Sequence, residues 1–408
     1  MLFKPFRGLR PRPDLASKVP SLPYDVPTTE EARRLARNDP YSFLHVIRPE
    51  VDLDPGIDPH DERVYAKARE NLRAMIDRGW LVRDEAPAYY VYRLTAGDHS
   101  QTGIVGAAAV EDYREDRIKK HEHTRPAKER DRVRIVEALA AHPGPVFLTY
   151  RAMDRLDAVV EAVTAAKPEV AFEAEEGIGH ELWIVDDADR RGEIERLFRE
   201  VPCSYVADGH HRAAAASKAE APSGGEAGRY FLAVHFPADQ LRILDYNRVV
   251  RDLNGLTVES FVERLAGAGF DVKRGHDAKR PPHRGSFGMY LDGSWSLLTL
   301  RPESVTATDV VARLDVAILA DRVLGPLLGI GDPRTDERID FVGGSRGMEG
   351  LECRVDDGDA ALAFALYPTS LDEVMQVADS GAVMPPKSTW FEPKLRSGMV
   401  VQSLDGDL

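Results

Sequence analysis

The chain has 408 residues, which at roughly 150 residues per domain predicts two or three domains or one large composite domain. Apolar residues make up 43% and charged residues 30%, which excludes a disordered or fibrous protein. The formal net charge of -14 argues against a nucleic-acid coat or a binder of anionic membranes, because both need a basic surface.

Cysteine usage and apolar runs indicate the compartment. Cys203 and Cys353 are the two cysteines, which excludes a disulfide framework or a cysteine-based zinc site and fits a reducing cytoplasm. The basic first twelve residues are not followed by an apolar segment, so no signal peptide is expected. The sequence contains no run of 18 apolar residues, so no membrane-spanning helix is expected. We therefore expect a soluble cytoplasmic protein.

The chain begins with an arm and continues with helices and strands. Residues 1–28 hold six prolines and little periodicity, which predicts an extended arm. Val64, Ala68, Leu72 and Met75 recur at helical spacing before Gly79, which predicts a helix over 60–78. The other elements expected in this part are helices over 29–37 and 126–141 and strands over 89–94 and 103–110, joined by a turn at 96–100.

The next elements alternate irregularly. Up to a boundary near 237–245, we expect strands over 147–150, 182–185, 204–207 and 229–236 and helices over 154–166, 189–200 and from 210. Beyond it we expect helices over 258–266, 315–324 and 371–379, a hairpin over 286–300, and strands near 339–343 and 360–366. This order favours an α+β fold with mixed sheets over a doubly wound parallel sheet. The expected division is 1–115, 116–240 and 241–408, which can also form one composite domain.

Two segments resemble known functional motifs but lack a feature that the chemistry of each motif requires. Residues 343–347 fit G-x-S-x-G, but a hydrolase of that type needs a histidine after Ser345, and the last histidine is His283. Residues 381–388 resemble a P-loop, but Pro386 has no N–H and cannot adopt a positive φ. We therefore interpret residues 343–347 as a glycine-rich turn and residues 381–388 as a surface segment.

Four histidines form two close pairs, at 121 and 123 and at 210 and 211. The first pair lacks the H-E-x-x-H spacing of a zinc peptidase, because Arg125 stands four residues after His121, where the second histidine is required. Neighbouring histidines on a helix point in different directions, so each pair supplies two ligands poorly. A histidine-ligated zinc stays open as a minor alternative.

The segment 205–216 predicts a strand, a tight Asp208-Gly209 turn and a helix that begins at once with His210, His211 and Arg212. The first turn of a helix exposes free N–H groups and the positive end of the dipole. Three cationic side chains there are unfavourable for the helix, so a bound anion would offset their cost. Phosphate binding is therefore favoured over the alternative, a solvated basic turn capped by Asp208.

The segment 118–129 also opens a helix, with Pro126 near its first position. Glu122 lies among lysines, arginines and histidines, which by itself describes an ordinary charged loop. Beside a phosphate site, however, a carboxylate becomes a candidate base or magnesium ligand. A third segment, 18–28, carries Tyr24 and Asp25 between prolines. By itself it predicts only an N-terminal arm that wraps around the body.

These segments together resemble a known family. FRGLRP, PYDV, SFLHVIRPE, KKHEHTRPAKERDR, ADGHHR and MPPKSTWFEPKLRSG are typical of domain-of-unknown-function family 1015. The segments 18–28, 119–122 and 208–212 also resemble, more remotely, the free-serine kinases of the SerK and SbnI type, which have a ParB-like fold. The expected fold is then a ParB/SerK-like mixed core with an N-terminal arm and additional α/β segments.

The kinase resemblance implies a transfer of phosphate from ADP or ATP to a hydroxyl group, with free L-serine as the best named acceptor. Glu122 corresponds to the proposed base and Asp208 joins it as a catalytic residue. The phosphates and magnesium would be bound around Gly209, His210, His211 and Arg212, with magnesium held mainly through the phosphates. The residues that would bind the acceptor are Lys120, His121, Thr124 and Arg125.

Two departures and one alternative accompany this resemblance. The 86 residues from Glu122 to Asp208 exceed the spacing in the small kinases, and the C-terminal third has no counterpart there, although 384–398 could close over the site. The alternative is a ParB-like nucleotide-binding regulator without kinase activity. Residues 114–134 and 1–20 each carry +4, which leaves -22 on the rest and predicts a basic pocket for a small phosphorylated ligand.

Overall fold

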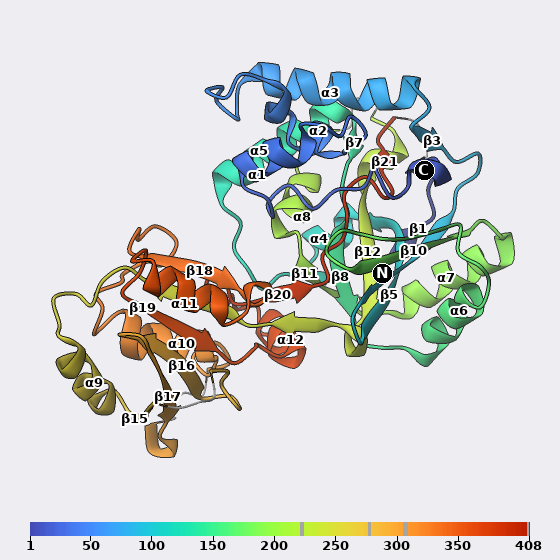
Figure 1. Cartoon of the computed structure of the whole chain (residues 1–408). Helices are drawn as coiled ribbons and strands as arrows, with labels where there is room; N and C mark the ends of the chain where they lie inside the picture. Colours follow the sequence, from blue (N-terminus) through green and yellow to red (C-terminus); the bar gives the residue numbers. More distant parts are fainter. Residues whose placement is uncertain (221–223, 276–278, 305–308, 406–407) are drawn as a thin grey trace. The chain divides into compact units, whose positions relative to one another are not determined.

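The computed structural model describes residues 1–220, 224–275, 279–304, 309–405 and 408 (Figure 1). Contacts divide the chain into two compact units. The first unit comprises Met1–Lys120, Thr124–Leu241 and Pro393–Leu408, and the second comprises His121–His123 and Arg242–Glu392. Each unit has its own sheet and helices, and antiparallel pairs dominate both, which confirms the expected α+β class.

The first unit is built on a nine-stranded mixed sheet, in which the strand order is β6-β11-β8-β12-β5-β4-β10-β9 and β1 pairs with β5. The β12–β8 and β11–β6 pairs are parallel, and the other pairs are antiparallel. The strands are β1 (Phe3–Lys4), β4 (Tyr89–Ala96), β5 (His99–Ala109), β6 (Ile118–Lys119), β8 (Val146–Tyr150), β9 (Val170–Glu173), β10 (Ile178–Val185), β11 (Ser204–Asp208) and β12 (Tyr230–Pro237).

The start of the chain lies against the body, as expected, and two short strands hold it there. Strand β1 joins the main sheet, and β2 (Leu9–Pro11) pairs with β3 (Leu81–Arg83). Leu9 also exchanges backbone hydrogen bonds with Val401, while β7 (Ala141–His142) pairs with β21 (Gln402–Ser403). The end of the chain therefore returns to the first unit.

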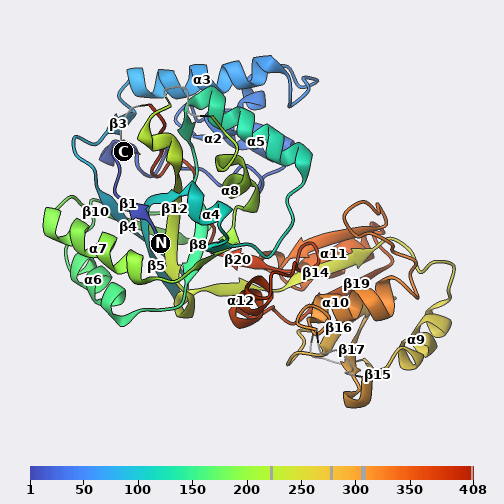
Figure 2. The same cartoon turned by 180° about the vertical axis from the view of Figure 1, so that it is seen from behind.

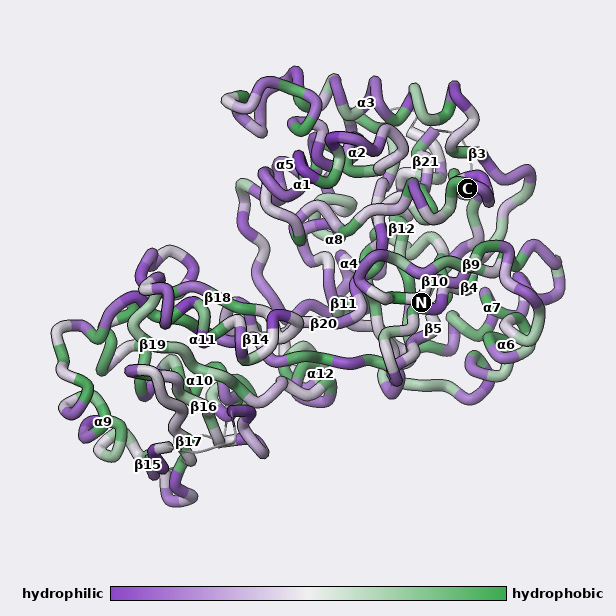
Figure 3. The backbone as a smooth tube through the Cα atoms, in the orientation of Figure 1, coloured by the Kyte–Doolittle hydropathy of each residue, from purple (hydrophilic) through white to green (hydrophobic). Residues whose placement is uncertain are grey.

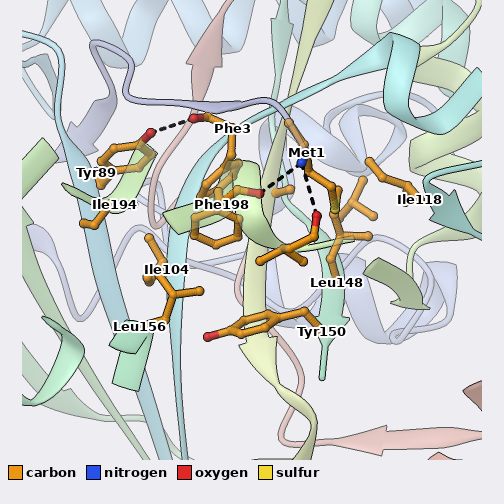
Figure 4. Close-up of a cluster of buried hydrophobic side chains, with 14 of the residues drawn as sticks. Met1, Phe3, Tyr89, Ile104, Ile118, Leu148, Tyr150, Leu156, Ile194 and Phe198 are labelled. Carbon is orange, nitrogen blue, oxygen red and sulfur yellow. Dashed lines mark hydrogen bonds between the residues drawn. The ribbon is translucent and has the colours of Figure 1, made fainter. Parts of the chain in front are cut away.

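An aromatic cluster fills one side of this sheet (Figure 4). The ring of Phe3 packs against Tyr89 and Phe198, and the Tyr89 hydroxyl donates a hydrogen bond of 2.6 Å to the Phe3 carbonyl. A Cβ on Gly106 would lie 2.5 Å from the Phe3 ring, so only glycine lets that ring reach the sheet. Each such buried side chain contributes roughly 1.5–3 kcal/mol.

Helices cover the sheet of the first unit and form a second apolar cluster. The helical stripe Val64, Ala68, Leu72 and Met75 is buried, as its spacing predicts. Helices α3 and α8 both pack against α5, as Figures 1 and 2 show from opposite sides. The helices of this unit are α1 (Thr29–Ala36), α2 (Leu44–Ile47), α3 (Glu62–Asp77), α4 (Val110–Arg114), α5 (Pro126–Leu139), α6 (Asp154–Thr164), α7 (Ala188–Glu200) and α8 (His210–Ala216).

The second unit contains a six-stranded antiparallel sheet in the order β15-β17-β16-β19-β14-β18. Figure 3 shows apolar stretches along its strands. Its strands are β14 (Tyr246–Val250), β15 (Phe270–Arg274), β16 (Ser286–Leu291), β17 (Ser294–Leu300), β18 (Ile339–Gly343) and β19 (Leu362–Leu366), with a separate pair β13 (Arg242–Leu244) and β20 (Trp390–Glu392). Its helices are α9 (Val258–Gly267), α10 (Asp315–Leu319), α11 (Glu349–Asp356) and α12 (Leu371–Asp379).

The elements predicted for the second unit are present, but the strands β13, β14, β15 and β20 were not predicted, and two helical segments differ from the expectation. The helix expected over 315–324 is α10 followed by one π-helical turn over Ala320–Leu324. Residues 349–356, for which no helix was predicted, form α11. Gly350 lies inside that helix and lowers its intrinsic propensity, so packing of Leu351 in the core decides the conformation.

Candidate active site

The Asp-Gly turn of the first unit has the predicted strand–turn–helix form. Strand β11 ends at Asp208, Gly209 adopts a left-handed conformation with φ of 94°, and α8 begins at His210. A Cβ on Gly209 would lie 2.9 Å from Arg212 Nε. Glycine is needed here for its positive φ and also because the Arg212 guanidinium folds back over the turn.

Asp208 carries a largely buried carboxylate between two cations. Its Oδ2 accepts a hydrogen bond of 2.8 Å from Lys394 Nζ, and Arg212 lies 3.8 Å from Oδ1. Burial alone would raise the pKa of Asp208, but Lys394 and Arg212 hold it well below its usual range. The Asp208 side chain is 27% exposed, so the group is charged and still reachable from solvent.

Lys394 is a site residue that sequence reasoning missed. It follows β20 and lies 186 positions after Asp208, at the start of the segment that returns to the first unit. The sequence-based hypothesis that 384–398 closes over the site contained this residue but weighed Lys387, because of the false P-loop. The lysine and the arginine of the E-P-K-L-R stretch both form ion pairs with first-unit carboxylates.

The two histidines of the motif differ from the expectation of a basic turn. His211 Nε2 accepts a hydrogen bond of 3.0 Å from the Arg125 N–H, which links the start of α5 to α8. Burial, followed by the nearby Lys128, lowers the pKa of His211 to about 4, so the ring is neutral at pH 7. The first turn of α8 thus does not carry three positive charges. His210 is buried close to Asp208.

The predicted acceptor-binding residues fall into two sets. Lys120, Thr124 and Arg125 belong to the first unit, and His121 belongs to the second. The Lys120 Nζ lies 4.4 Å from the centroid of the Tyr113 ring and 3.8 Å from Asp116 Oδ1. The Thr124 hydroxyl donates a hydrogen bond of 2.8 Å to Glu129, while Arg125 is exposed at the N-cap of α5.

Glu122 and His121 lie in the part of the chain that joins the second unit. The His121 carbonyl accepts a hydrogen bond of 2.9 Å from the Met384 N–H, and its Nε2 lies 3.5 Å from the Thr389 hydroxyl. His121 is buried, and Glu122 is partly exposed. Within its own unit, His121 therefore contacts the M-P-P-K-S-T segment that the sequence singled out.

Two cavities lie next to each other in the first unit. The smaller has a volume of about 30 Å³, and its walls include Arg212, Arg132 and Tyr24. The larger has a volume of about 350 Å³ and is more polar, with Arg48 and Lys128 in its wall. Tyr24 and Arg132 line both cavities, so the two meet at this pair, where the guanidinium carbon lies 3.9 Å from the ring centroid.

Arg48 fixes the part of the arm that lines these cavities. Its guanidinium donates to the carbonyls of Tyr24 at 2.7 Å and Pro27 at 2.8 Å, to the Thr29 hydroxyl at 2.7 Å, and to Glu50 at 2.6 Å. One partly buried side chain thus satisfies two backbone carbonyls of the arm. The P-Y-D-V-P segment is therefore a cavity wall, which its sequence alone could not tell.

Among the residues that the structure describes, no three histidine, cysteine, aspartate or glutamate side chains gather into a metal site. Helices long and apolar enough to cross a bilayer are likewise absent from the described ranges. Cys203 and Cys353 are both free thiols.

Comparisons with known proteins agree with the motifs. The family model described as "Protein of unknown function (DUF1015)" matches residues 3–317. No curated protein matches the chain.

Three solved structures are similar to the chain. They are a conserved hypothetical protein from Pyrococcus furiosus (14% identity, TM-score 0.35, covering 69% of this chain and 90% of that one), a free serine kinase in complex with AMP (15%, 0.35, 68% and 84%), and SbnI with a C-terminal truncation from Staphylococcus aureus (13%, 0.38, 71% and 82%). At these identities and TM-scores the likeness says nothing of this chain's chemistry.

Proposed function

Because the chain belongs to the family "Protein of unknown function (DUF1015)", whose description names no activity, we propose a function from the site itself. We propose that the protein is a kinase that transfers a phosphoryl group from ADP or ATP to a hydroxyl of a small metabolite. Free L-serine is the named acceptor that the motif resemblance suggests. The two free thiols suit the reducing cytoplasm, which we propose as its location.

The observation that carries this proposal is the pair of cations on one carboxylate. Lys394 and Arg212 both face Asp208, so the group has one more positive than negative charge. Lysine and arginine are the residues that proteins use for phosphate, and they are most effective where water is partly excluded. The Lys394 side chain is only 13% exposed and that of Arg212 only 12%. A nucleotide phosphate would complete the charge balance.

Phosphoryl transfer needs positioning and charge neutralisation more than covalent chemistry. In the proposed mechanism, Arg212 and Lys394 bind the phosphates of the nucleotide, and Asp208 orients the two cations. His210 and Gly209 shape the turn around the phosphates, and neutral His211 holds the start of α5. Magnesium, when bound, supplies further charge neutralisation. The described residues offer it no cage of three ligands, so it would come with the nucleotide.

Glu122 is the proposed base that accepts the proton of the acceptor hydroxyl. This role rests on the resemblance of Lys119–Glu122 to the K-x-H-E segment of the kinases. A positioned base contributes typically ~10²–10⁴-fold to the rate. Lys120, His121, Thr124 and Arg125 are proposed to orient the acceptor.

The test is a direct product assay. The protein is incubated with ADP or ATP, magnesium and a panel of free amino acids and hydroxy acids, and phosphorylated products are detected by mass spectrometry. We expect a phosphorylated product, with a rate lowered ~10²–10⁴-fold in Glu122→Gln. Nucleotide binding should stay unchanged in that variant, and Glu111→Gln, on the exposed face of α4, is the matched control.

The outcomes separate the alternatives. Full activity of Glu122→Gln would remove the base assignment. A nucleotide-dependent rise in melting temperature without any product would instead favour the ParB-like nucleotide-binding regulator. Neither product nor a shift in melting temperature would refute both.

A further inference from the structure

Strand β15 forms one edge of the six-stranded sheet in the second unit (Figure 1). Among the described residues it pairs with β17 alone, on one of its two sides. An edge strand presents N–H and C=O groups that can pair with a strand of another chain. The hydrogen-bond pattern and the sequence of β15 decide which strand fits this edge.

The register of the β15–β17 pair shows which backbone groups point outward. The Arg301 N–H donates a hydrogen bond of 2.9 Å to the carbonyl of Gly269, one residue before β15 begins. Along an antiparallel strand, the backbone groups of every second residue point to the same side. The N–H and C=O groups of Phe270, Val272 and Arg274 therefore point away from β17, toward the free edge.

A groove of about 560 Å³ runs along this edge. Four of the five residues of β15 line it, including the consecutive residues 270–272, so the groove follows the edge of the strand rather than one face of the sheet. The other wall is one face of α9, formed by Glu259, Val262, Glu263 and Ala266. The lining holds three acidic and two basic side chains, so neither sign of charge dominates.

The sequence of β15 is complementary to itself when two copies run antiparallel. A pairing centred on Val272 places Asp271 of each copy opposite Lys273 of the other. Both side chains are exposed, and Asp271 stays 73% exposed although Arg301 lies 3.7 Å away. Opposite charges that face each other directly stabilise an antiparallel pair. A twofold arrangement gives this ion pair twice.

The same centre satisfies the hydrogen-bond pattern. It brings Val272 opposite Val272 and Phe270 opposite Arg274, so the outward-pointing backbone groups face one another. A register centred between two residues would instead place these groups opposite groups that bond to β17. Registers centred one residue away would place Asp271 opposite Asp271 or Lys273 opposite Lys273, and facing like charges are destabilising.

We propose that β15 pairs with the β15 of a second copy of this chain, so that the two six-stranded sheets join into one continuous sheet across a twofold axis at Val272. A twofold interface uses the same surface on both copies, which a self-complementary strand provides. The axis is perpendicular to the sheet, so both copies of α9 lie on the same face of the joined sheet. This pairing is independent of the proposed kinase activity.

Sedimentation velocity of the full chain, over a concentration series from micromolar upward, measures the association. The contact of a five-residue strand is small, so we expect a weak dimer whose population rises with concentration. Lys273→Asp and Asp271→Lys, which each bring like charges together, should weaken dimerisation at least ~10-fold, or about 1.4 kcal/mol. Lys167→Asp makes the same change of charge at an exposed position of the first unit and should leave dimerisation unchanged.

Mixing the two variants restores the complementarity. In the mixed dimer each facing pair again joins an acid with a base, so Lys273→Asp and Asp271→Lys should associate with each other at least ~10-fold more tightly than either associates with itself. Both positions are exposed, and an unchanged melting temperature of each variant verifies its fold.

Two results would overturn the proposal. A wild-type chain that stays monomeric over the whole series would mean that the charges on β15 serve only to protect an edge strand from pairing. A wild-type dimer that neither substitution weakens would place the contact between copies elsewhere on the chain.

Discussion

Replacing Lys394 with methionine removes the amine that lies 2.8 Å from Asp208 and leaves the carboxylate with Arg212 at 3.8 Å. Loss of one partner from a buried ion pair costs about 3–5 kcal/mol. Asp208 is 27% exposed and keeps a second cation, so we expect a cost at or below the bottom of that range, about 2–3 kcal/mol. At about 2–4 °C per kcal/mol for large domains, the melting temperature should fall by about 4–12 °C.

The assay is urea and thermal unfolding of four proteins at pH 7: wild type, Lys394→Met, Asp208→Asn and the double variant. Since Asp208→Asn removes the charge, the second substitution should then cost little, and the coupling energy should be about 1–3 kcal/mol. Lys167→Met, an exposed lysine of the first unit, is the control. Additive effects within about 0.5 kcal/mol would refute the ion pair.

The same pair has a defined pH dependence. The pKa of Asp208 is lowered in the folded protein, so its stabilising contribution is present above the unfolded value near 4 and is lost as the pH falls through the folded value. The difference in unfolding free energy between wild type and Lys394→Met should therefore shrink in acid. A difference that grows in acid would contradict this assignment.

Three further substitutions test local features. Thr28→Ala removes the side chain that accepts from the Glu31 N–H in the capping box of α1 and should cost about 1 kcal/mol, measured by urea unfolding. Gly209→Ala should cost about 1–2 kcal/mol from its φ alone and should weaken nucleotide binding, because the new Cβ meets Arg212; a variant as stable as wild type would contradict the geometry. Burial holds the pKa of His142 near 4, so acid favours the unfolded state below pH ~6.5, by up to about 3 kcal/mol; His142→Gln should flatten that slope of unfolding free energy against pH.

Local patterns predicted the elements well where side chains repeat at a clear period. The stripe from Val64 to Met75 indicated α3, and Asp208-Gly209 indicated the end of β11 and the start of α8. Edge strands such as β9 and β15 were missed, because Val170–Glu173 and Phe270–Arg274 are only four and five residues long and depend on partners for their conformation.

The candidate site was predictable only in its local part. The Asp-Gly turn and Arg212 follow from neighbouring residues, whereas Lys394 reaches Asp208 across 186 positions and shares its chemistry with Lys387. The sequence predicted a cationic His211, because neither its burial nor the hydrogen bond from the Arg125 N–H can be seen in the sequence. The sequence did not predict the contact between Tyr24 and Arg132, because it depends on how the N-terminal arm packs against α5.

The return of the chain to its first unit has a consequence for folding during synthesis. Residues up to Leu241 supply nearly all of the first unit, but Pro393–Leu408, which brings Lys394 and the partner of β7, follows 393 − 241 = 152 positions later. At ~5–20 residues per second, a ribosome needs about 8–30 s to reach it. During that time β7 has no partner strand and Asp208 has Arg212 but not Lys394, so the ion pair between Lys394 and Asp208 forms only after the rest of the first unit has been synthesised.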